Sequence, residues 1–133
     1  MKRRSLSPLG ETEMEVLNHV WTLGEATVAA VRDRILEERD IAYTTVMTVM
    51  KKLAGKGFLR FDSDGGTYVY GAARPPGEVR QEILEGLLDS VFQGSRTALV
   101  QTLVQGQAIT GAEREELLAL VETLAGEGGG TDG

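Results

Sequence analysis

The sequence predicts a mostly helical protein that contains one small β-hairpin and is divided into an amino-terminal and a carboxy-terminal part. Apolar residues recur at the spacing of an α-helix through most of the chain, whereas strand-like alternation is confined to residues 58–70. The composition, with 41% hydrophobic and 26% charged residues, is typical of a globular protein. A length of 133 residues predicts one domain, or one domain with a small accessory unit.

The boundary between the two parts is expected at Pro75-Pro76, where glycines flank a proline pair. Residues 1–74 carry 11 Lys and Arg against 10 Asp and Glu, a net charge of +1, whereas residues 75–133 carry 3 against 10, a net charge of −7. The overall charge of −6 therefore hides a first half that is not acidic. The expected organisation is a first domain over residues 1–74, a helical domain over 75–125 and a flexible Gly-rich tail over 126–133.

The first helix is expected to begin after Gly10, because Glu13 occupies the position of a capping box, and to end at Gly24. Its apolar stripe at helical spacing consists of Met14, Leu17, Val20 and Trp21. A short extended segment, residues 25–27, leads into a second short helix. The apolar stripe of that helix consists of Val28, Val31, Ile35 and Leu36.

The third helix is expected over about Ala42 to Lys56 and ends at Gly57. Alternation then replaces the helical period in residues 58–62 and 67–70, and Ser63 to Gly66 form a turn between them. This pattern predicts a β-hairpin with a Gly-rich tip. Three helices followed by a two-stranded hairpin is the order of a winged helix-turn-helix, in which the third helix enters the major groove of DNA.

The second half shows helical patterning only. A long apolar face runs from Val79 to Phe92, Gly94-Ser95 interrupts it, a short helix covers Thr97 to Val104, and a capping box at Thr110 precedes a last helix. Three helices in about 50 residues enclose little core of their own, so we expect a helical dimerisation domain that pairs with a second copy of the chain. The candidate interface residues are Leu87, Leu88, Leu117 and Val121.

The third helix divides its residues between two faces. One face carries apolar residues at core spacing, and the other carries threonines and lysines, although threonine is a poor helix former. Threonine can hydrogen-bond to base edges and touch the thymine methyl, and lysine neutralises phosphates. This face and the hairpin supply the candidate DNA contacts, which are Tyr43, Thr44, Thr45, Met47, Thr48, Lys51, Lys52, Arg60 and Tyr68.

Other interpretations of these residues stay open. Exposed threonines and lysines also occur on ordinary solvated helices, and alternate hairpin residues can pack on the helices instead of contacting phosphates. Residues 2–4, Lys-Arg-Arg, form either an arm that reaches into DNA or a solvated terminus. Two further functions are a winged-helix module that docks on a protein and a repressor that is controlled by a small ligand in the helical half.

The sequence argues against an enzyme, a metalloprotein and a membrane protein. It contains no cysteine and a single histidine, His19, so it lacks the ligands of a usual structural metal site. It has no Gly-rich phosphate loop and no His-based triad, and no cofactor is expected. The longest apolar run, Leu117 to Val121, is too short for membrane insertion, so a soluble cytoplasmic protein is expected.

Two segments resemble the BlaI/MecI family of penicillinase repressors: Leu9 to Leu17 with Trp21, and Ala42 to Met50 with the following Leu53, Lys56 and Gly57. The resemblance covers about residues 8–105, and YTTVMTV, residues 43–49, is its most specific part. It implies a homodimeric repressor whose winged helices bind dyad-related half-sites of a double-stranded DNA operator. It further implies a helical half that dimerises and that is cleaved when a membrane sensor protease triggers derepression.

The chain departs from the family at the cleavage site. The family has an Asn-Phe pair there, and the matching positions here are Gln101 and Thr102, which lack the aromatic side chain. Cleavage within Ser95 to Gly106 and control without proteolysis both stay open. A related branch senses copper through carboxy-terminal cysteines, which this chain does not contain.

Overall fold

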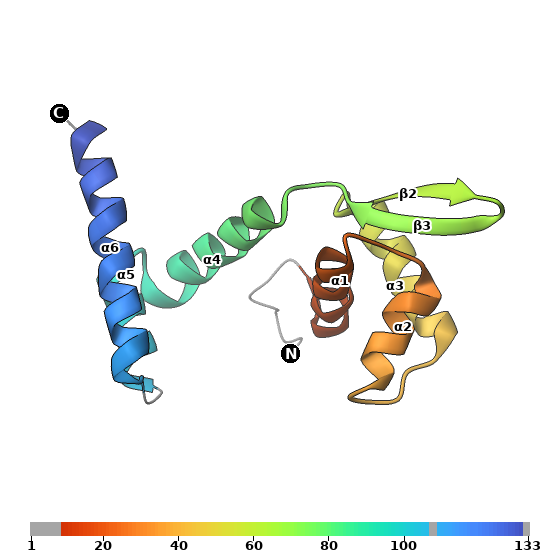
Figure 1. The fold of residues 1–133 in the computed structure, drawn as a ribbon, viewed down its shortest axis with the longest axis horizontal. Coiled ribbons are helices and arrows are strands. Elements are labelled where there is room, and N and C mark those ends of the chain that lie inside the picture. Colours follow the sequence, from red (N-terminus) through yellow and green to blue (C-terminus); the bar gives the residue numbers. More distant parts are fainter. Residues whose placement is uncertain (1–8, 107–108, 132–133) are drawn as a thin grey trace. The chain divides into compact units, whose positions relative to one another are not determined.

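The computed structural model describes residues 9–106 and 109–131, which form two compact units that meet between Val91 and Phe92. The first unit contains α1 (Glu11–Leu23), β1 (Glu25–Ala26), α2 (Val28–Leu36), α3 (Tyr43–Gly55), β2 (Leu59–Asp64), β3 (Thr67–Ala72) and all but the last residue of α4 (Pro76–Phe92) (Figure 1). The second unit contains α5 (Arg96–Gly106) and α6 (Gly111–Thr131). The predicted fold class, mostly helical with a small β-hairpin, is confirmed.

Local signals set the ends of the first two helices as the sequence predicts. Before α1, the backbone N–H of Gly10 donates a hydrogen bond to Glu13 Oε1 (2.8 Å), and the helix ends at Gly24, whose φ of 85° suits a glycine. Before α2, the hydroxyl oxygen of Thr27 accepts a hydrogen bond from the backbone N–H of Ala30 (3.1 Å). These caps fix the two helices on which α3 packs.

The sheet has three antiparallel strands in the order β1-β3-β2, so the extended segment after α1 adds a third strand to the predicted hairpin. The hairpin strands are longer than predicted, because Ser63 and Asp64 belong to β2 and Asp64 pairs with Thr67. Gly65 and Gly66, with φ values of 61° and 90°, complete a two-residue turn by themselves. The predicted four-residue turn, residues 63–66, is therefore wrong in length.

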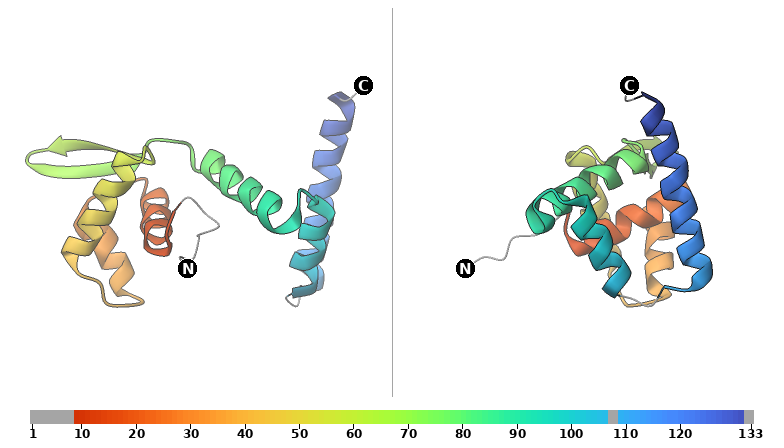
Figure 2. Two further views of the ribbon diagram at one scale, coloured as in Figure 1. Left: turned by 180° about the vertical axis from the view of Figure 1, so that it is seen from behind. Right: turned by 90° about the vertical axis from the view of Figure 1, so that its left-hand side faces the viewer.

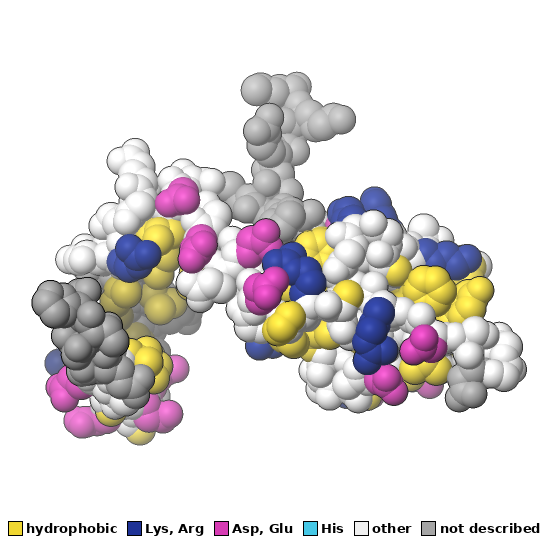
Figure 3. All heavy atoms as spheres, turned by 90° about the horizontal axis from the view of Figure 1, so that it is seen from above, with side chains coloured by type: hydrophobic (Ala, Val, Ile, Leu, Met, Phe, Trp, Pro, Cys, Tyr) yellow, Lys and Arg dark blue, Asp and Glu magenta, His cyan; other side chains and the backbone are white. Residues whose placement is uncertain are grey.

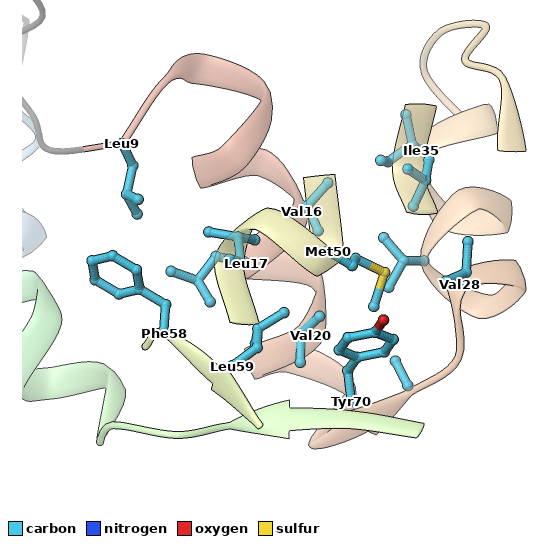
Figure 4. Close-up of a cluster of buried hydrophobic side chains, with 14 of the residues drawn as sticks. Leu9, Val16, Leu17, Val20, Val28, Ile35, Met50, Phe58, Leu59 and Tyr70 are labelled. Atoms are coloured by element: carbon cyan, nitrogen blue, oxygen red, sulfur yellow. The ribbon is translucent and has the colours of Figure 1, made fainter. Parts of the chain in front are cut away.

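The core of the first unit lies between the first three helices and the sheet (Figure 4). Its fully buried side chains include Val16, Leu17, Val20, Val31, Ile35, Val46, Met50, Leu53 and Tyr70. Of the predicted core positions on α3, only Val49 is half-buried, and it packs against this cluster. Because the apolar stripe of α3 faces inward, its threonines and lysines face outward.

The first half of α4 also belongs to this core. Val79 is 1% exposed and lies in the same cluster as Leu17 and Leu59, and Ile83 packs against the cluster. The sequence analysis assigned both residues to the apolar face of a separate domain that begins at residue 75. The structure instead divides the compact units after Val91, because α4 completes the core of the winged helix.

In the second unit, α5 contains no buried residue, and Figure 2 shows α6 as one continuous helix. A flexible tail was expected from Gly126, but the helix continues to Thr131, and residues 132–133 lie outside the described part of the chain. Each glycine weakens a helix by about 1 kcal/mol relative to alanine without forbidding it. No helix among the described residues is long and apolar enough to cross a membrane.

One ion pair, in which Glu13 is buried and Lys56 is exposed, joins the end of α3 to the start of α1. Lys56 Nζ donates hydrogen bonds to both carboxylate oxygens of Glu13, at 3.0 and 2.9 Å. Burial raises the pKa of the Glu13 carboxyl, but the hydrogen bonds from the Gly10 N–H and from Lys56 outweigh burial and hold the pKa below its usual value. The ionised form of Glu13 is therefore the form that stabilises the fold.

We expect this carboxylate to make the free energy of unfolding depend on pH. A lowered folded-state pKa contributes stability above the pKa of an unfolded Glu, about 4.3, and this contribution is lost as the pH falls through the folded-state value. Glu13→Gln should therefore flatten the decrease of stability below about pH 4.3, as measured by urea denaturation at several pH values. An unchanged pH dependence in this variant would contradict the assignment.

Candidate nucleic-acid interface

The outward face of α3 carries the polar residues that the sequence singled out. Thr44, Thr45, Thr48, Lys51 and Lys52 are all exposed. Within the described part of the chain, the side-chain hydroxyls of the three threonines have no hydrogen-bond partner. These hydroxyls are therefore free to bind base edges or phosphates.

A groove separates α3 from the hairpin and consists of two hollows. The first, of about 300 Å³, is lined by the start of α2, by Tyr43, Met47 and Lys51, and by residues 66–68 of the hairpin. The second, of about 410 Å³, lies further along α3, at Ala54 and Gly55. Three residues, Lys51, Tyr68 and Tyr70, line both hollows, so we name the two together the α3–hairpin groove.

The hairpin face toward α3 is aromatic. Side chains alternate along a strand, so Leu59 and Phe61 share this face. Tyr70, the cross-strand partner of Phe61, and Tyr68, two residues before it, share the same face on the opposite strand. Leu59 and Tyr70 are buried, whereas Phe61 and Tyr68 extend beyond the core and are 50% and 47% exposed, with ring centroids 5.2 Å apart. The sequence analysis missed Phe61, whose alternation with the buried Leu59 is the signal that could have identified it.

Arg60 lies on the opposite face of the hairpin. Both Arg60 and Glu25 are cross-strand partners of Gly71, and the guanidinium of Arg60 crosses Gly71 to reach Glu25 Oε2 at 3.3 Å. A Cβ atom on Gly71 would lie 2.8 Å from Arg60 Nη2, so the glycine permits this crossing. Asp62 is a second acidic neighbour, at 3.8 Å. The structure thus places Arg60 apart from the other candidate DNA contacts.

Residues 41–61 contain four basic residues and no acidic residue, but the basic surface that they form is narrower than this count indicates. Lys56 is paired with Glu13 and Arg60 with Glu25, whereas Lys51 and Lys52 form no ion pair within 4.0 Å among the residues that the structure describes. Figure 3 shows one face of the molecule, on which Lys and Arg side chains are interspersed with Asp and Glu. Within residues 41–61, the positive charge without an ion-pair partner is therefore concentrated on α3 beside the groove.

The tyrosine at the base of the groove is neutral. Burial raises the pKa of the Tyr70 hydroxyl, and the neighbouring Tyr68 and Tyr43 raise it further. An uncharged phenol beside Lys51 does not oppose the approach of an anion. The groove therefore combines one cationic centre with apolar and aromatic walls.

The remaining sequence candidates of the first half have other environments. His19 is half-buried, and its Nδ1 accepts a hydrogen bond from Arg34 Nε at 3.0 Å. Residues 2–4, the possible arm, lie outside the described residues. Within the described ranges there is no group of three or more His, Cys, Asp or Glu that could hold a metal ion.

In the second unit, an apolar hollow of about 270 Å³ is lined by residues of both helices, including Val100 and Leu103 on α5 and Leu118 on α6. Two predicted interface residues, Leu117 and Val121, also line it and are 37% and 62% exposed. On α4, Leu87 is half-buried and Leu88 is already 8% exposed in the single chain. Among the predicted interface residues, the exposed ones thus lie on α6 and not on α4.

The predicted cleavage positions lie in the middle of α5. Gln101 and Thr102 are both exposed, and the hydroxyl of Thr102 donates a hydrogen bond to the backbone oxygen of Ala98 at 2.9 Å. A protease binds its substrate as an extended strand, so α5 has to open before a cut at this position.

Residues 9–123 match the protein family described as penicillinase repressor. The transcriptional regulator BlaI of Mycobacterium tuberculosis is 36% identical over 131 residues, which cover 92% of this chain and 90% of that protein. The methicillin resistance regulatory protein MecI of Mammaliicoccus sciuri is 24% identical over 109 residues, which cover 82% and 89% of the two proteins.

Two solved structures share the fold. The YusO protein from Bacillus subtilis has a TM-score of 0.53 at 14% identity, with 88% of this chain and 74% of that chain covered. A mutant of MarR from E. coli in complex with operator DNA has a TM-score of 0.51 at 12% identity, with 88% and 76% covered. These similarities confirm the predicted winged-helix fold.

Proposed function

The chain belongs to the penicillinase repressor family and is a transcriptional repressor of the BlaI/MecI type, and on this premise we propose that it binds a dyad-symmetric DNA operator as a homodimer. The observation that carries the proposal is the exposed face of α3, where three free threonine hydroxyls stand beside two unpaired lysines. A protein that works on operator DNA acts in the cytoplasm, and we assign it no catalytic role.

We propose that α3 enters the major groove and that Thr48 contacts a base edge. Thr48 is central on the exposed face, and threonine offers both a hydroxyl and a methyl to base pairs. Thr44 and Thr45 lie one turn earlier, at the helix end that points toward the bases in helix-turn-helix proteins. Lys52 follows on the same face and would neutralise a phosphate.

The α3–hairpin groove fits the DNA backbone that separates the major groove from the minor groove. In a winged helix, α3 occupies the major groove and the hairpin lies against the adjacent backbone, so one strand passes between them. Lys51 would bind a phosphate of that strand, and Phe61 and Tyr68 would pack on its deoxyriboses. Met47 and Tyr43 line the same groove and would complete this contact surface. Arg60 would take no part in it, because Arg60 is paired with Glu25 on the opposite face of the hairpin.

The apolar hollow of the second unit supports dimerisation. Eight large apolar side chains on α5 and α6, six of which line the hollow, are exposed in the single chain: Val100, Leu103, Val104, Leu117, Leu118, Leu120, Val121 and Leu124. An exposed apolar patch of this kind marks an interface, and a second copy of the chain supplies the complementary leucines by symmetry. Release of the operator then follows from any event that separates the two copies, either cleavage in α5 by a protease under the control of a membrane sensor or binding of a small ligand.

The proposal is tested by titrating the full-length protein against its own upstream DNA at several salt concentrations. DNA binding releases counterions, so the logarithm of the affinity should fall linearly with the logarithm of the salt concentration, by about 0.9 for each neutralised phosphate. Absent or salt-independent binding would contradict the proposal and favour the protein-docking module instead.

Single substitutions separate the roles of the α3 residues. Lys51→Ala and Lys52→Ala should each weaken binding to all sequences alike and lower the salt slope by about 0.9. Thr48→Ala should instead reduce discrimination at one base position, by roughly 1 kcal/mol or more, with an unchanged salt slope. Arg60→Ala is the matched control, because its charge is already paired with Glu25 on the far face of the hairpin.

Fluorescence anisotropy with a panel of single-base operator variants measures both effects. If Thr48→Ala preserved the preference among the variants, direct recognition by Thr48 would be wrong. If Arg60→Ala lowered the salt slope as much as Lys51→Ala, the assignment of the binding surface to the α3 side of the hairpin would fail.

A further inference from the structure

Three successive sets of contacts attach α4 to the rest of the winged helix. At the start of α4, the guanidinium of Arg74 lies 5.6 Å from the centroid of the Phe58 ring and binds the carboxylates of Glu78 (3.0 Å) and Glu82 (2.8 Å). One turn of α4 is thereby joined to the segment between α3 and β2, where Phe58 is buried. The proline pair at the start of α4 is therefore followed at once by tertiary contacts.

The second set lies in the core itself, and the third is a contact with α1. Val79 is 1% exposed inside the cluster of the winged helix, and Ile83 packs against that cluster one turn later. Next to Val79, the guanidinium of Arg80 lies 4.9 Å from the centroid of the Trp21 ring. The Trp21 indole N–H is buried without a hydrogen-bond partner within the described residues, so packing and this cation–π contact hold the ring in place.

These contacts end before α4 does. Leu84 and Val91 are both about half exposed (47% and 49%), and Leu88, although buried, does not belong to the cluster of the winged helix. The backbone after the helix leaves the right-handed region at two consecutive residues, Gln93 (φ 52°) and Gly94 (φ 81°). The division into compact units falls beside this point, after Val91.

We infer that Val79 and Arg80 make α4 a rigid extension of the winged helix, so that the joint between the DNA-binding head and the dimerising unit follows α4 instead of preceding it. Arg80 is a positioning residue, because it acts on DNA recognition only through the direction of α4. This inference rests on the proposed function. If α4 is rigid, a dimer binds only operators whose half-sites lie at a suitable distance from each other. A freely jointed head at Pro75-Pro76 would accept many spacings.

Hydrogen exchange of the full-length protein tests the rigid attachment without DNA. Segments that unfold as one unit share one opening free energy, so the slowest amides of α4 should exchange together with those of α1. Val79→Ala removes two buried methyl groups from the shared core and should accelerate both helices by about tenfold while it leaves α5 unchanged. Leu84→Ala, at an exposed position of the same helix, is the matched control.

The inference is overturned if the wild-type α4 amides exchange as fast as those of α5, or if Val79→Ala accelerates α4 alone. Fluorescence gives a second test that does not depend on a core substitution. Trp21 is the single tryptophan of the chain, and Arg80→Ala should increase its quenching by acrylamide, whereas Arg80→Lys and the neighbouring Gln81→Ala should not. Unchanged quenching in Arg80→Ala would also overturn the inference.

Operators with altered spacing test the consequence for recognition. Inserting about 5 base pairs, half a helical turn, between the half-sites should weaken wild-type binding strongly. The Arg80→Ala variant should bind the operator of natural spacing more weakly than the wild type does. The insertion should then reduce the affinity of this variant by a smaller factor than it reduces the affinity of the wild type. If the wild type binds no DNA, the proposed function fails while the exchange result stands. If the wild type discriminates between spacings and Arg80→Ala discriminates equally, the inference about Arg80 fails.

Discussion

Replacing Leu117 and Val121 with aspartate is expected to lower operator affinity by about 10²- to 10⁴-fold while the winged helix stays folded. Both side chains line the apolar hollow of the second unit and are exposed in the single chain. In a dimer they would be buried, and burying an unpaired carboxylate costs several kcal/mol. The substitutions therefore act on the association of two chains and leave the core of the first unit untouched.

The size of this effect follows from the tethering of two DNA-binding heads. Once one head binds its half-site, the second head experiences an effective concentration that reaches the millimolar range, which commonly adds 10²- to 10⁴-fold to the affinity. A monomeric variant keeps the exposed face of α3 but loses this factor. Binding to an isolated half-site should therefore be nearly unchanged, which separates loss of dimerisation from damage to the DNA-binding surface.

Sedimentation and anisotropy on the same samples measure this prediction. Thr123→Asp is the matched control, because a helix with 3.6 residues per turn places position 123 on the side of α6 away from Leu117 and Val121. The control should remain dimeric and keep its affinity. A wild-type protein that sediments as a monomer at tens of micromolar, or a Leu117→Asp and Val121→Asp variant that remains dimeric, would contradict the symmetric repressor.

The helices and the α3 face could be predicted from sequence because each rests on a local, periodic signal. Val46, Met50 and Leu53 recur at helical spacing, so their burial fixes the direction of Thr48 on the opposite face. The ends of α1 follow equally from short-range chemistry, because Glu13 and Gly24 act within one turn of the helix. The family resemblance rests on the same two stretches of chain.

Two features that the sequence analysis missed, the packing of α4 on the winged helix and the pairing of Arg60, depend on contacts between distant residues. Val79 has the periodicity of any amphipathic helix, and nothing local indicates whether its apolar face meets the winged helix or a second copy. Arg60 is an ordinary strand residue until the register of three strands aligns it with Gly71 and Glu25. A count of Lys and Arg along the sequence therefore overestimates the basic surface wherever an Asp or Glu from a distant part of the chain pairs with one of them.

Severing the chain between Gln101 and Thr102 is expected to release the operator with a loss of affinity of the same order, about 10²- to 10⁴-fold. The cut separates Leu117 and Val121 from the winged helix without touching α3. Because α5 contains no buried residue, its hydrogen bonds are supported by few tertiary contacts, and its local opening free energy should be low. The helix can then supply the extended conformation that a protease requires.

A site-specific protease sequence that replaces residues around Gln101 makes this prediction measurable in the purified protein. Cleavage in α5 should dissociate the protein from DNA, whereas the same protease sequence added after residue 133 should be cut without any change in affinity. Retained binding after complete cleavage in α5 would show that the two pieces of the second unit stay assembled, and proteolysis at this position would then be no switch.

Whether the chain is cut during derepression decides how the natural protein is controlled. The pair Gln101 and Thr102 lacks the aromatic side chain of the family cleavage site, so susceptibility of α5 does not by itself imply a protease that recognises it. Under full derepression in the source cells, mass spectrometry of the chain should show either fragments that end within residues 95–106 or the intact mass. Fragments support the protease mechanism, and an intact chain excludes it and assigns control to a ligand that separates the two copies.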